Sequence, residues 1–149
     1  MSVKIKTELQ FVIPGQPVAK GRPKAAKRGD HITIYTPKKT VNYESLVAYA
    51  ASIAMAGKNL MLKPIYLELD VRLPIPASWS ATRKKKAVDG LIAATKKPDL
   101  DNLEKSVKDG MNGVVWHDDS LVVKVSKCKR YAEIPGVVVI VRELDLEVA

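Results

Sequence analysis

The sequence has few of the residues that build disulfide frameworks, zinc sites and membrane spans. Cys128 is the only cysteine, so neither an intrachain disulfide nor a thiolate zinc site can form. The two histidines, His31 and His117, leave any other zinc site short of ligands. No apolar run approaches the roughly 18 residues of a membrane helix, and residues 1–13 show no secretory signal pattern. These absences predict a cytoplasmic protein with no membrane partner.

Aromatic and acidic residues are also scarce. Aromatic residues make up 5% of the chain and apolar residues 46%, so we expect a core of mainly aliphatic side chains. A chain of 149 residues suits one domain, residues 1–149. The 25 Lys and Arg residues outnumber the 16 Asp and Glu residues, which gives a formal charge of +9. This excess favours a nucleic-acid partner, because each neutralised phosphate releases condensed counterions.

The hydrophobic pattern predicts an α+β domain with two main helices and a mixed β-sheet. Strands are expected at residues 9–13, 31–35, 65–73, 121–125 and 137–141, and the basic residues 127–130 are expected to extend the strand at 121–125. Helical spacing predicts one helix over residues 40–57, with Thr40 as its N-cap, and another over 102–112. A short basic helix is expected over 81–88, with Ser78 or Ser80 as its N-cap. The basic segment 20–30 is predicted to be a mobile loop.

Acidic residues gather at the expected start of the 102–112 helix. Pro98 is expected to keep Asp99 and Asp101 in extended chain, where residues i and i+2 project to one side and can share a cation. Carboxylate oxygens are preferred ligands of Mg²⁺. Lys105 lies one helical turn after Asp101, within reach of a phosphate at such a metal. Asn102 is expected to hydrogen-bond a ligating carboxylate from outside the metal's own shell.

A second acidic pair, Asp118 and Asp119, follows this helix and can bring a third carboxylate back to the helix start. The acids also have a structural interpretation, because Asp101 followed by Glu104 matches a capping box and the second pair suits a solvated turn. A basic nucleic-acid-binding protein without catalysis is therefore the main alternative. A phosphotransferase or nucleotide hydrolase is disfavoured, because the sequence has no glycine-rich phosphate loop.

The motif Lys97-Pro-Asp-Leu-Asp-Asn-Leu-Glu-Lys105, followed by Asp118-Asp-Ser-Leu-Val-Val123, resembles the RusA-type Holliday junction resolvases of bacteria and their prophages. Two early segments, Pro14-Gly-Gln-Pro17 and Lys20-Gly-Arg-Pro-Lys24, resemble the phage-type members, and the likeness extends over about residues 11–141. It implies a RusA-like fold and a crossover junction endodeoxyribonuclease. Such an enzyme is a homodimer that uses Mg²⁺, or Mn²⁺ in its place, and resolves four-way and other branched DNA by paired nicks.

The matching motif positions imply an acidic metal site within residues 99–119. Asp99, Asp101 and Asp119 would bind the metal, with Asp118 as the alternative to Asp119, and Lys105 would be the catalytic lysine. The way the second acidic pair leads into the following strand favours Asp119. Basic side chains expected to contact the DNA backbone are Lys20, Arg22, Lys24, Lys27, Arg28, Arg83, Lys84, Lys96 and Lys97, together with Lys85, Lys127, Lys129 and Arg130.

Overall fold

The computed structural model describes residues 3–149 and confirms an α+β fold around a mixed sheet. The main sheet has the strand order β1-β6-β4-β5. Its strands are β1 (Ile5–Pro14), β4 (Ile65–Pro74), β5 (Val122–Ala132) and β6 (Gly136–Leu144). β6 runs antiparallel to both β1 and β4, whereas β4 and β5 are parallel. The four strands predicted here are confirmed. β1 and β6 extend beyond the predicted range at both ends, and β4 extends one residue further. β5 begins one residue later than predicted and continues through the basic residues 127–130, as expected.

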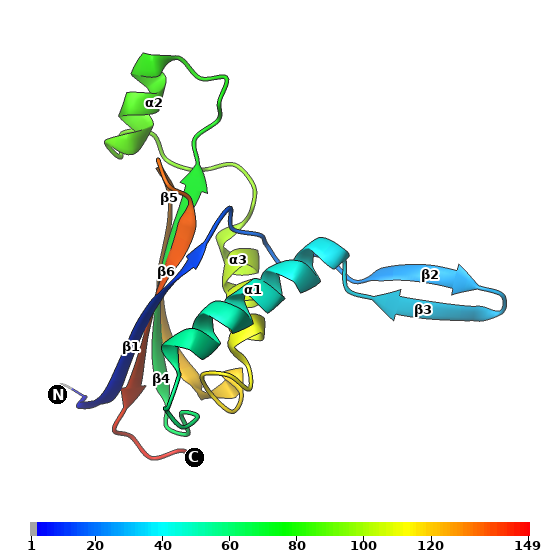
Figure 1. Ribbon diagram of the computed structural model, residues 1–149, viewed down its shortest axis with the longest axis vertical. Helices are drawn as coiled ribbons and strands as arrows, with labels where there is room; N and C mark the ends of the chain where they lie inside the picture. Colours follow the sequence, from blue (N-terminus) through cyan, green and yellow to red (C-terminus); the bar gives the residue numbers. More distant parts are fainter. Residues whose placement is uncertain (1–2) are drawn as a thin grey trace.

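The two main helices are α1 (Lys38–Ala54) and α3 (Leu100–Met111), and both lie on the same side of the main sheet (Figure 1). The short basic helix α2 (Ala81–Val88) stands beyond the ends of β4 and β5 (Figure 1). Its predicted bounds are confirmed, and the Ser80 hydroxyl caps it by accepting a hydrogen bond from Arg83 N at 3.2 Å. A single 3₁₀ turn, η1 (Asp119–Leu121), leads into β5.

The core forms where alternate residues of the sheet meet the two helices. The five odd-numbered residues of β4, from Ile65 to Leu73, are 0–6% exposed, as expected of a strand with one face on the core. α1 and α3 approach each other closely at Gly110, where a Cβ atom would lie only 2.6 Å from Cβ of Val47. The aliphatic core predicted from composition also holds Trp116, which is fully buried and donates its indole N–H to Asn112 Oδ1 at 2.7 Å.

The first basic segment is a hairpin, so the prediction of a mobile loop over residues 20–30 is wrong. β2 (Lys24–Arg28) pairs with β3 (His31–Tyr35) in a separate antiparallel sheet that projects from the body beyond the start of α1 (Figure 1). The two-residue connection contains Gly29, whose φ of 62° favours glycine. β2 escaped detection because Lys24-Ala-Ala-Lys-Arg28 contains no β-branched or aromatic residue.

The predicted start of α1 is also wrong. Pro37 is the N-cap, with an extended backbone, and the helix begins at Lys38. Thr40 is buried and its hydroxyl accepts a hydrogen bond from Gly21 N at 3.0 Å, so it ties the root of the hairpin to the helix instead of capping it. The helix ends at Ala54, not at residue 57.

Candidate active site

The first acidic pair lies at the start of α3, but not in the conformation that the sequence predicted. Asp99 is the N-cap and has an extended backbone, whereas Asp101 already lies in the first helical turn. The expectation that both residues share one extended stretch is therefore wrong. Pro98 restricts the backbone of Lys97, the residue before it, and does not prevent helix formation from Leu100 onward.

Asp99 has no helix-capping hydrogen bond from its side chain, although it occupies the N-cap position. The capping box expected of Asp101 and Glu104 is also absent, since Asp101 is not the N-cap residue. The carboxylates at this helix start are thus not used in the way that the structural interpretation of the motif requires.

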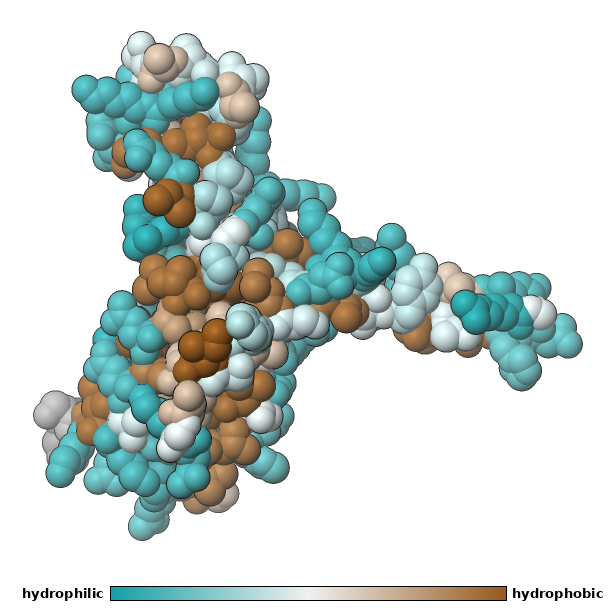
Figure 2. Space-filling view, in the orientation of Figure 1, coloured by the Kyte–Doolittle hydropathy of each residue, from teal (hydrophilic) through white to brown (hydrophobic). Residues whose placement is uncertain are grey.

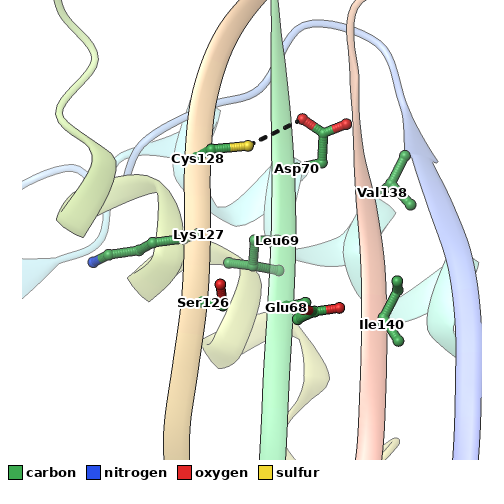
Figure 3. A pocket seen from close by; sticks show the side chains of 8 residues that line it. All are labelled: Glu68, Leu69, Asp70, Ser126, Lys127, Cys128, Val138 and Ile140. Atoms are coloured by element: carbon green, nitrogen blue, oxygen red, sulfur yellow. Dashed lines mark hydrogen bonds between the residues drawn. The ribbon is translucent and has the colours of Figure 1, made fainter.

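Asp101 is paired with a lysine from the neighbouring strand β5. Lys127 Nζ donates to Asp101 Oδ1 at 2.6 Å and lies 2.8 Å from Glu104 Oε1, so one ammonium group bridges two carboxylates. The hydrogen bond from Lys127 lowers the pKa of Asp101, whose side chain is 91% exposed. Figure 3 shows Lys127 extending from β5 toward α3. From the sequence, Lys127 was predicted to contact DNA. Glu104 was not predicted to be part of the site.

Glu104 bridges two lysines. Besides Lys127, it contacts Lys108 Nζ through Oε2 at 2.9 Å, one turn further along α3. Burial opposes ionisation of Glu104, but hydrogen bonds from both lysines outweigh it and lower its pKa. The spacing of residues 104 and 108 is the signal by which this helical ion pair could have been found in the sequence.

The two residues of the second acidic pair, Asp118 and Asp119, differ in their contacts. Asp118 is the N-cap of η1, and its Oδ2 accepts a hydrogen bond from Ser120 N at 3.3 Å. Hydrogen bonding from the side chain of Ser120, and then from its backbone N–H, lowers the pKa of Asp118. Asp119 is the first residue of η1, half-buried, and no side-chain hydrogen bond or ion pair in residues 3–149 involves its carboxylate. The carboxylate of Asp119 is therefore available to a ligand.

Lys105 lies on the exposed side of α3, and no carboxylate of residues 3–149 forms an ion pair with it. Two polar residues that follow Lys105 at helical spacing, Asp109 and Asn112, do not pair with it. Asp109 contacts Lys20 Nζ at 3.0 Å, and the amide of Asn112 is occupied by the indole of Trp116. The side chain of Asn102 is exposed, while its carbonyl oxygen accepts a hydrogen bond from Lys20 N at 2.9 Å.

A fit to Mg²⁺ can be judged from the donor groups. Aspartate oxygens suit this hard cation, and two of the three proposed ligands, Asp99 and Asp119, take part in no ion pair within the described residues. In residues 3–149, no three His, Cys, Asp or Glu side chains stand close enough to form a ready-made metal centre. The chemistry of the three carboxylates thus fits Mg²⁺, but the structure does not gather them into one cluster.

Lys129 supports the connection that leads into α3. Its Nζ donates to the carbonyl oxygens of Lys96 and Pro98, at 2.9 and 3.0 Å. These bonds attach the residues just before Asp99 to strand β5. The sequence predicted a phosphate contact for Lys129, and alternation along the strand gave no indication of this carbonyl-binding role.

Most of the side chains predicted to contact DNA are exposed. Lys20 differs from them, because it is half-buried and its ammonium group is paired with carboxylates. Lys20 bridges Glu44 of α1 and Asp109 of α3. An open hollow of about 620 Å³ lies beside it at the root of the hairpin. Its basic lining residues are Arg22, Lys24, Lys39 and Lys97, and it reaches Pro98, the neighbour of Asp99. This hollow joins the basic hairpin to the acidic end of α3.

The second basic region surrounds α2. Arg83 lies over the ring of Trp79, 4.0 Å from its centroid, and Trp79 meets Tyr131 edge to face at 5.2 Å. Lys84 is half-buried, whereas Lys85, Lys96 and Lys97 are exposed. These contacts attach the basic helix to the end of β5 and place its positive charge at one end of the molecule (Figure 1).

The sheet face opposite the helices carries the cysteine of the chain. A hollow of about 240 Å³ there contains Cys128 and Asp70, and the thiol donates to Asp70 Oδ1 at 3.4 Å (Figure 3). Burial and the Asp70 carboxylate raise the pKa of Cys128, which disfavours the thiolate. Asp70 itself is held by Arg130 and Arg72, and its pKa falls to about 2.

Comparison with known proteins identifies the family. The family description Endodeoxyribonuclease RusA matches residues 14–142. A Bacillus subtilis (strain 168) relative, described as uncharacterized protein YqaN, is 37% identical over 139 residues, which cover 92% of this chain and 97% of the relative. No helix within residues 3–149 is long and apolar enough to cross a membrane. Because the match spans the hairpin, α3 and η1, the chain belongs to the RusA family of endodeoxyribonucleases.

Proposed function

We propose that this chain resolves four-way DNA junctions by Mg²⁺-dependent phosphodiester hydrolysis, with one nick in each of two opposed strands. The observation that carries the proposal is the family match over residues 14–142, which includes every residue proposed to act. The net charge of +9 and the exposed basic side chains support a DNA substrate.

Asp99, Asp101 and Asp119 would hold the metal. Bound there, Mg²⁺ would lower the pKa of a water molecule and neutralise charge on the scissile phosphate. Lys105, which has no carboxylate partner in residues 3–149, would stabilise the charge that develops on the phosphate. Lys127 would restrain Asp101 and offset the repulsion between the Asp101 and Glu104 carboxylates. Mn²⁺ would substitute for Mg²⁺, because it takes the same oxygen ligands.

The proposed active form is a homodimer. Two opposed strands of a junction must be cut, and a two-fold dimer presents one site to each. The basic side chains of the hairpin and of α2 would follow the duplex arms through their phosphates, which contributes affinity without base-sequence preference.

The alternative is a non-catalytic basic nucleic-acid-binding protein whose acids are helix caps. The contacts favour it at one position only, because Asp118 caps η1 while Asp99 makes no capping bond and Asp101 is not an N-cap. The two functions differ in their need for a metal.

The test uses the full chain with four-way, forked and linear DNAs of matched sequence, with Mg²⁺ or with EDTA. The proposal predicts symmetric nicks in the four-way DNA with Mg²⁺, little cutting of linear duplex and none in EDTA. Binding to all three DNAs without any Mg²⁺-dependent nicking would contradict the proposal and support the alternative.

A further inference from the structure

The β2–β3 hairpin is a projecting arm whose two strands pack mainly on each other. Figure 1 shows it extending away from the sheet and the helices, attached to the body at the start of α1. Its root is held by hydrogen bonds from Gly21 N to Thr40 and from Lys20 N to Asn102. A two-stranded hairpin on its own is only marginally stable in water. The arm is attached to the body at its root, and the rest of the chain covers little of its surface. It therefore suits contact with a partner.

The register gives the arm two different faces, because directly opposed residues of an antiparallel pair share a face. Ile34 is opposite Ala25 and Ile32 is opposite Lys27, so the two isoleucines lie on one face. They are 72% and 71% exposed. The other face carries the opposed pairs Lys24 with Tyr35, Ala26 with Thr33 and Arg28 with His31. Figure 2 shows apolar and hydrophilic residues side by side along the arm.

The positive charge of the arm indicates that its partner is a polyanion. Arg22, Lys24, Lys27 and Arg28 are all exposed, and Asp30 is the only acid between residues 21 and 35. The hollow at the root of the arm is also lined by basic residues, and its lining extends to Lys97 and Pro98, next to Asp99. A polyanion that follows the arm would therefore reach the acidic end of α3, and a basic two-stranded ribbon fits a DNA groove.

The two isoleucines need a different contact from the one that the lysines make. In continuous duplex the base-pair faces are stacked on each other, so an apolar side chain reaches them only at the cost of unstacking a base step. At a branch point, the last base pair of each arm can expose its face. We propose that the hairpin is a branch-point probe, in which Ile32 and Ile34 pack against exposed base-pair faces while Lys24, Lys27 and Arg28 hold the flanking phosphates.

This inference rests on the proposed function, since it supplies the preference for branched DNA over linear duplex. The test is a binding measurement in EDTA, so it does not require cleavage. The variant Ile32→Thr/Ile34→Thr keeps β-branched side chains and strand propensity but removes the apolar contact. The ratio of Kd for linear duplex to Kd for the four-way junction should fall about tenfold or more. The salt dependence of binding should stay as in the wild type, because no charge is lost.

A matched control is Ile134→Thr, which alters an isoleucine that is 80% exposed in the turn between β5 and β6. The ratio of Kd values should not change in this variant. Lys24→Gln/Lys27→Gln should weaken binding of both DNAs alike and reduce the salt slope by up to about two. A 2-aminopurine base at the branch point should brighten on binding of the wild type and not of the isoleucine variant.

An unchanged Kd ratio in Ile32→Thr/Ile34→Thr would overturn the inference. Loss of a dimer in the DNA-free variant, measured by sedimentation, would also overturn it, because the apolar face would then belong to contact with a second copy of this chain. Failure of the proposed function is distinguishable from both outcomes: the wild type would then bind junctions but show no Mg²⁺-dependent nicking.

Discussion

At the scale of single residues, the candidate site separates carboxylates that have a structural partner from those that have none. Asp118 accepts a hydrogen bond from Ser120 N, and Asp101 and Glu104 share the ammonium group of Lys127. Asp99 and Asp119 make no such contact within the described residues. The family resemblance left Asp118 and Asp119 as alternatives for one ligand position, and this difference in contacts favours Asp119.

The first prediction compares those two neighbours. Asp119→Asn should lower the rate of Mg²⁺-dependent junction nicking at least about 100-fold, because a neutral amide is a poor ligand of a hard cation. Asp118→Asn should keep most of the activity, since the amide oxygen of asparagine can still accept the hydrogen bond from Ser120 N. Initial rates on a four-way DNA measure both. The opposite order of effects would make Asp118 the ligand.

At the scale of elements, a strand could be predicted from the sequence where buried and exposed residues alternate along it. A strand could not be predicted where its residues are mostly exposed. β4 could be predicted because its odd-numbered residues face the core and are almost entirely apolar. β2 could not, because its five residues are exposed or half-buried and its partner β3 is its main support. The adjacent Gly29 and Asp30 were the available signal, since glycine followed by aspartate suits a two-residue hairpin loop.

The candidate site, too, could be predicted from the sequence only in part. The sequence located the acids at the start of α3, but it could not show that Lys127 and Lys129 of β5 reach this element. Those contacts depend on the packing of β5 against α3, which brings together residues 26 to 33 positions apart. Local spacing carries no information on such pairs, so a phosphate contact was the natural interpretation of an unpaired lysine.

The second prediction tests the contact between the two main helices. Gly110→Ala should destabilise the protein by about 1–3 kcal/mol, because the added methyl would lie 2.6 Å from Cβ of Val47 and 2.9 Å from the carbonyl oxygen of Glu44. A backbone oxygen cannot move aside as a flexible side chain can. The measurement is urea unfolding followed by circular dichroism. Gly57→Ala is a poor control because Gly57 has a positive φ of 77°, whereas Ser45→Ala on the exposed side of α1 should change stability little.

At the scale of the whole molecule, positive charge occupies two separate projections, and the candidate acids follow both of them along the chain. The hairpin carries one group of lysines and arginines and α2 carries the other, while α3 and η1 follow α2 in sequence. A DNA with several arms suits such a distribution better than a single straight duplex does, because separate basic surfaces can each follow one arm. The central claim is that the acids serve catalysis and that the basic surfaces serve binding.

The most direct test of that claim is Asp101→Asn, measured for both binding and nicking of a four-way DNA. The variant should bind the junction in EDTA at least as tightly as the wild type does, because loss of a negative charge does not weaken phosphate contacts. Mg²⁺-dependent nicking should be lost, with a fall of at least about 100-fold in rate. Nicking at the wild-type rate would contradict the site, and so would loss of binding and nicking together in a protein that remains folded.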